Sequence, residues 1–85
     1  MSSVSDLDRI LAEQLDHARD MLVTMGDELA MNQDVVADHG VALQAVDIVG
    51  QMLGHIANVV RAEDRRAAVD KIGMCELKAT LAAAA

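Results

Sequence analysis

The sequence predicts an all-α fold, in which an antiparallel helical hairpin and a short C-terminal helix assemble with a second copy into an intermolecular helical bundle. Three observations support this class. The 85 residues include no proline and no aromatic residue, and this composition fits neither a turn-rich β-fold nor a disordered chain. Two long segments repeat their apolar residues at helical spacing. One of these segments is more apolar than so short a chain readily covers, which favours a partner.

The whole chain is expected to form one domain, residues 1–85, whose first helix covers about 5–30. Ser5 is a suitable N-cap, and two aspartates in the first turn face the positive end of the helix dipole. Gly26 lowers helix stability inside this segment. The spacing predicts one amphipathic helix, whose apolar stripe consists of Leu7, Leu11, Leu15, Ala18, Leu22, Met25 and Leu29.

The second helix is predicted over about 34–62, after a turn near 31–34. Its polar residues form only a narrow stripe, and its apolar residues form two stripes side by side. One neighbouring helix covers one stripe, so this helix needs partners on two sides. The first stripe follows a heptad pattern through Val36, His39, Leu43, Val46, Gly50, Leu53, Ala57 and Val60. The second stripe consists of Val35, Ala42, Val49, Met52, Ile56 and Val59.

A C-terminal helical segment is predicted over about 64–81, with Gly73 as a helix terminator and 82–85 as a frayed tail.

The first stripe of the second helix is the predicted self-association surface. Gly50 and Gly54 are one turn apart and remove side chains where another backbone approaches. The alternative interpretation is tight packing between the helices of one chain. The residues predicted to bind a second copy are Leu43, Val46, Gly50, Leu53, Gly54, Ala57 and Val60.

The charge is unevenly distributed. The net charge of −7 opposes binding to nucleic-acid phosphates. Residues 1–60 hold ten acidic and two basic residues, whereas residues 61–85 hold four acidic and five basic residues. We therefore predict that Arg61, Arg65 and Arg66 make an electrostatic contact with a partner. The acidic first helix also fits a protein that offers carboxylates to a basic surface, although a solvated face is the commoner reason.

No pattern of catalytic, metal-binding or cofactor-binding residues stands out, and the predicted function is non-enzymatic. The three histidines, His17, His39 and His55, have no setting that indicates chemistry. His39 is predicted to be a hydrogen-bonded polar residue within an apolar stripe. The single cysteine, Cys75, is predicted to be a small buried residue of the core. The predicted protein is a homodimeric regulator or adaptor that acts by binding protein.

Two other functions stay open. A transcription-associated regulator would bind DNA, or a DNA-binding protein, through the basic C-terminal segment. A histidine phosphotransfer bundle would use His55, which has no basic residue within about a turn to support a phosphate.

The location is predicted to be cytoplasmic. The N-terminus has neither a basic start nor an apolar run, which disfavours an export signal. The apolar stretch 41–60 is interrupted by Asp47 and four other polar residues, which disfavours a membrane span.

Overall fold

The computed structural model describes residues 4–84, and these residues contain four helices and no strand. The all-α prediction is therefore confirmed. The helices are α1 (Asp6–Ala30), α2 (Gln33–Arg61), α3 (Arg65–Asp70) and α4 (Cys75–Ala84).

Polar caps begin the two long helices. The Oγ of Ser5 accepts a hydrogen bond from the backbone N–H of Asp8 at 3.0 Å, and the Asp8 carboxylate accepts one from the Ser5 N–H at 3.4 Å. This reciprocal pair is a capping box. The side-chain oxygen of Asn32 accepts from the N–H groups of Asp34 and Val35, at 2.9 and 3.2 Å. These caps satisfy N–H groups that have no partner within their own helix.

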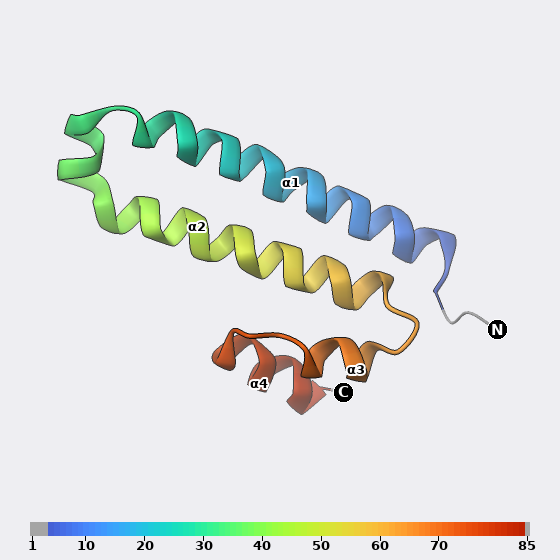
Figure 1. Cartoon of the computed structure of the whole chain (residues 1–85). Helices are drawn as coiled ribbons and strands as arrows, with labels where there is room; N and C mark the ends of the chain where they lie inside the picture. The colour runs from blue at the N-terminus through green and yellow to red at the C-terminus, as the bar shows by residue number, and fades with distance from the viewer. Residues whose placement is uncertain (1–3, 85) are drawn as a thin grey trace.

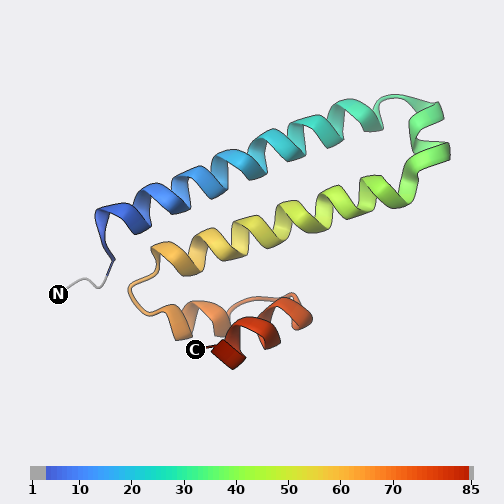
Figure 2. The same cartoon turned by 180° about the vertical axis from the view of Figure 1, so that it is seen from behind.

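The helices are arranged as an elongated, flat molecule (Figure 1). Helices α1 and α2 lie side by side and run in opposite directions, while α3 and α4 lie on the other side of α2, beside its C-terminal half (Figures 1 and 2). The molecule measures 52 × 26 × 15 Å, and its radius of gyration of 15.2 Å exceeds the value of about 12 Å for a compact chain of this length. Near the α1–α2 connection no third helix is present (Figure 1).

Helices α1 and α2 approach closely where each has a glycine. A β-carbon added at Gly26 would lie 2.9 Å from Cγ1 of Val46, and one added at Gly50 would lie 3.4 Å from Cγ2 of Val23. Gly50 is buried and Gly26 is half-buried. The position of Gly26 inside a helix thus has a packing reason that offsets its low helix propensity.

Helix α2 bends at His39, whose backbone angles of φ −130° and ψ 27° are not helical. His39 is exposed, so the expectation of a hydrogen-bonded histidine within an apolar stripe is wrong. The bend separates the first turns of α2 from the rest of the helix, and the predicted heptad pattern is not continuous across it.

The C-terminal segment forms two helices that are joined by a turn containing Gly73. Val69 and Ile72 are 4% and 5% exposed. Asp64 caps α3, because its carboxylate accepts from the N–H of Ala67 at 3.0 Å. Residues 82–84 are helical, which differs from the predicted frayed tail and is consistent with the high helix propensity of alanine. Ala85 lies outside the described residues.

Candidate protein-binding face

Three of the seven residues predicted to bind a second copy, Val46, Gly50 and Gly54, lie against α1 of the same chain. Gly50 is close to Val23, Gly54 is close to Arg19, and Val46 is close to Gly26. All seven predicted residues, from Leu43 to Val60, are buried or half-buried. This geometry supports the alternative interpretation, tight packing between the chain's own helices. Self-association through these residues stays a prediction.

Two of the three arginines that were predicted as partner contacts form ion pairs with α1. Nη2 of Arg61 lies 2.5 Å from Oδ2 of Asp16, and Nη2 of Arg65 lies 2.7 Å from Oδ2 of Asp8. Arg66 is exposed and forms no ion pair within residues 4–84. Because two of these guanidinium groups already face carboxylates, the cluster is a weaker binding site for phosphate or for an acidic partner than its sequence suggests.

One face of the α1–α2 pair is apolar and uncovered. Successive helical residues turn by about 100°, so Leu11, Met25 and Leu29 lie on one flank of the α1 residues that meet α2. Val49 lies on the corresponding flank of Gly50. Both helices are right-handed and they run antiparallel. These two flanks therefore lie on the same side of the α1–α2 pair. We call this surface the apolar face, and its exposed residues are Leu7, Leu11, Ala18, Met25, Leu29, Ala42 and Val49.

The opposite face carries ion pairs. Nη1 of Arg19 lies 3.2 Å from Oδ1 of Asp16, and Nη2 of Arg19 lies 3.1 Å from Oδ1 of Asp20. Asp16 also pairs with Arg61 and so joins α1 to the end of α2. A β-carbon at Gly54 would lie 3.2 Å from Nη1 of Arg19, which places this guanidinium against α2. The helical pair is therefore charged on one face and apolar on the other.

The exposed area of the chain is large for its mass. The surface measures 6105 Å² for 9.0 kDa, whereas a compact monomer of this mass exposes about 4,900 Å². The excess of about 1,200 Å² is larger than the roughly 800 Å² that each partner contributes to a standard protein interface. Among the described residues, the buried apolar ones are Ala12, Ala57, Val69 and Ile72.

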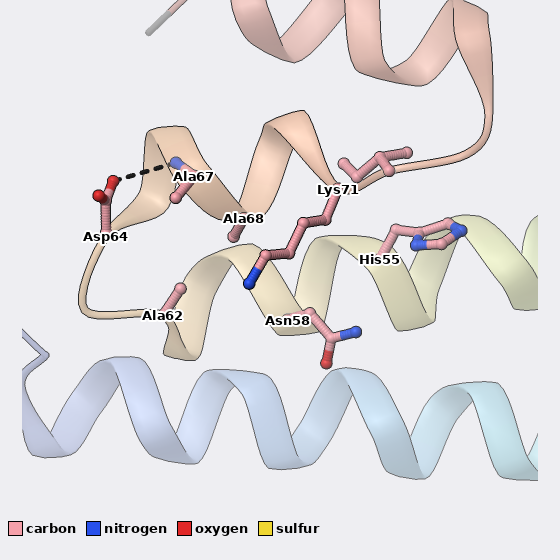
Figure 3. A pocket seen from close by; sticks show the side chains of 8 residues that line it. His55, Asn58, Ala62, Asp64, Ala67, Ala68 and Lys71 are labelled. Atoms are coloured by element: carbon pink, nitrogen blue, oxygen red, sulfur yellow. Dashed lines mark hydrogen bonds between the residues drawn. The ribbon is translucent and has the colours of Figure 1, made fainter.

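A pocket of about 520 Å³ lies between α2 and α3, and His55 and Asn58 of α2 line it together with Asp64 and Lys71 (Figure 3). Lys71 follows α3 and lines the same pocket as His55, although the two residues are far apart in sequence. Its ammonium group points toward Asn58 and Ala62 and away from the imidazole (Figure 3). Sequence reasoning missed this cation because it considered only basic residues within about a turn of His55. The pocket also contains the carboxylate of Asp64, which lowers its affinity for anions.

The remaining reactive side chains show no cluster. His17 and His39 are exposed, and no group of three metal-binding side chains occurs in the described part of the chain. Cys75 is an exposed free thiol at the start of α4. The expectation of a core cysteine is wrong, because only Val69 and Ile72 of this region are buried.

Helix α2 is long and apolar enough to cross a bilayer, judged by length and composition alone. Only 17% of its most apolar window is buried. Core helices of soluble proteins pass the same test, so this property is weak evidence for a membrane span. The low burial does agree with an apolar surface that is not covered within one chain.

The sequence matches no protein family model, and no curated protein or solved structure shows significant similarity to it.

Proposed function

We propose that this chain is a non-enzymatic, cytoplasmic protein that acts through protein–protein interaction, as a homodimeric regulator or adaptor. In this proposal the α1–α2 pair is an antiparallel hairpin, and two hairpins with their C-terminal helices assemble into an intermolecular helical bundle. Helices stabilise a domain by burying an apolar stripe against another layer. Here the second layer comes from another copy of the chain.

The excess exposed area is the observation that carries this proposal. One chain leaves large apolar side chains such as Leu7, Met25 and Val49 between 44% and 64% exposed. A 9.0 kDa chain has a small hydrophobic core, and oligomer formation is one of the ways in which such chains become stable. A symmetric dimer covers the same apolar patch on both copies with one contact.

Sedimentation equilibrium at micromolar concentration tests the proposal. The expected mass is twice the 9.0 kDa of the chain. Because the contact is apolar, the dimer should change little between about 0.05 and 0.5 M NaCl, a range over which interactions between exposed charges are strongly screened. A measured mass of 9.0 kDa at every micromolar concentration of the protein would contradict the proposal.

Phosphotransfer at His55 is a second candidate, and the presence of Lys71 in the same pocket favours it. A small phosphodonor such as acetyl phosphate would transfer its phosphoryl group to an imidazole nitrogen and leave as acetate, and Lys71 would offset the phosphate charge by turning its ammonium group toward His55. The expected product is an acid-labile phosphate that is absent from His55→Gln and reduced in Lys71→Ala. Unlabelled wild-type protein would refute this function.

A further inference from the structure

Among the described residues, the apolar face is a large surface of the α1–α2 pair that neither the chain's own helices nor the ion pairs described above cover. We infer that the second copy of this chain packs on this face, so that the two α1–α2 pairs form the two layers of a four-helix core. This inference rests on the proposed homodimer and adds its location. It moves the dimer contact away from the stripe of Gly50 and Gly54, which α1 of the same chain already covers.

The arrangement of helices leaves this face without another cover. Helix α1 packs mainly against α2, and α3 packs against α2 and α4. The α3–α4 segment lies beside the C-terminal half of α2 (Figure 2). Beyond it, Met25 and Leu29 of α1 and Val49 of α2 are 47%, 40% and 44% exposed.

Two observations support a second copy as the occupant. The chain as a whole exposes about 1,200 Å² more than a compact monomer of its mass, and this excess is larger than the roughly 800 Å² that each partner of a standard dimer buries. The exposed residues of the face include no charged side chain, so two copies meet without like charges at the centre of the contact. A face that meets itself across a two-fold axis must be self-complementary, and an aliphatic surface with flexible Met25 meets this condition.

Adjacent residues on each helix supply matched variants. Leu11 lies on the apolar face and is 46% exposed, whereas Ile10 is 54% exposed and points away from α2. Val49 lies on the face and is 44% exposed, whereas Ile48 is 50% exposed and lies on the outer side of α2. In each pair, the same apolar-to-acidic substitution is made at two neighbouring positions of one helix. The two side chains have similar exposure and point in directions about 100° apart.

The test measures the dimer dissociation constant of Leu11→Glu and Val49→Glu beside Ile10→Glu and Ile48→Glu, by sedimentation and by dilution calorimetry. Each face variant places two carboxylates in the symmetric contact, and its dissociation constant should rise at least about a hundredfold. The two control variants should stay within about threefold of wild type. Circular dichroism should show helical spectra for all four proteins at high concentration.

The outcomes separate the two proposals. A monomeric wild type refutes the homodimer itself and leaves the apolar face to a different partner. A dimeric wild type whose face variants also stay dimeric refutes only the location inferred here. Equal weakening by face and control variants likewise refutes the location, because it shows that any added carboxylate has the same effect. Leu11→Met and Val49→Ile keep the face apolar and should remain dimeric, which would show that the acidic variants lose the dimer through the added charge and not through any change at these positions.

Discussion

The close approach of α1 and α2 at Gly26 can be tested by a substitution that adds one methyl group. In Gly26→Ala the new β-carbon would lie 2.9 Å from Cγ1 of Val46, closer than carbon atoms pack. Valine has one strongly preferred rotamer in a helix, so its methyl group does not simply rotate away. In Gly40→Ala nothing lies within 4 Å of the new carbon. The two substitutions therefore make the same chemical change in a crowded and in an open place.

The two effects on Gly26→Ala oppose each other. Replacing glycine by alanine inside a helix stabilises a protein by about 1 kcal/mol, and overpacking at a tight contact costs about 1–3 kcal/mol. The net expectation is a loss of about 0–2 kcal/mol for Gly26→Ala and a gain of about 0.5–1 kcal/mol for Gly40→Ala.

Urea unfolding followed by circular dichroism at 222 nm gives both values. All proteins must be compared at one concentration, because dimer formation adds a concentration-dependent term to the free energy of unfolding. A Gly26→Ala protein that gains as much stability as Gly40→Ala would refute the close packing of α1 on α2 at this position.

Two further changes test the polar contacts of α1. Ser5→Ala removes the side chain that accepts from the Asp8 N–H, so urea unfolding should show a loss of about 1 kcal/mol, and an unchanged midpoint would show that the cap does not form in solution. Asp16→Asn weakens the ion pairs with Arg19 and Arg61. Because these groups are partly exposed, the free energy of unfolding should fall by about 0.5–1 kcal/mol at low salt and by less in 0.5 M NaCl. A loss that does not depend on salt would point to a different cause.

The fold class and the beginning of the first helix follow from local chemistry. Ser5 caps α1 as its position before two aspartates predicts. Asn32 begins α2 because its side chain satisfies two N–H groups of the first turn. These interactions join residues a few positions apart, so the sequence contains all the information that they need.

Hydrophobic spacing alone does not predict which flank of each helix contacts the neighbouring helix. The apolar stripe of α1 runs from Leu7 to Leu29, but the contact with α2 is displaced toward Arg19 and Gly26. A glycine permits a closer backbone approach than a leucine, and the ion pairs of Arg19 add a polar border to that contact. The same limit applies to Lys71 and His55, which line one pocket because of the direction in which the chain turns after α2.

The two most deeply buried large side chains, Val69 and Ile72, lie in the short C-terminal part of the chain and not in the two long helices. Val69 lies in α3 and Ile72 just after it, and α3 packs against both α2 and α4. Met52, Ile56 and Val59 in the C-terminal half of α2 are half-buried. In a chain that ended at Arg61, the side of α2 that α3 contacts would be exposed to water. The short C-terminal part therefore contributes more buried apolar side-chain surface than its length suggests.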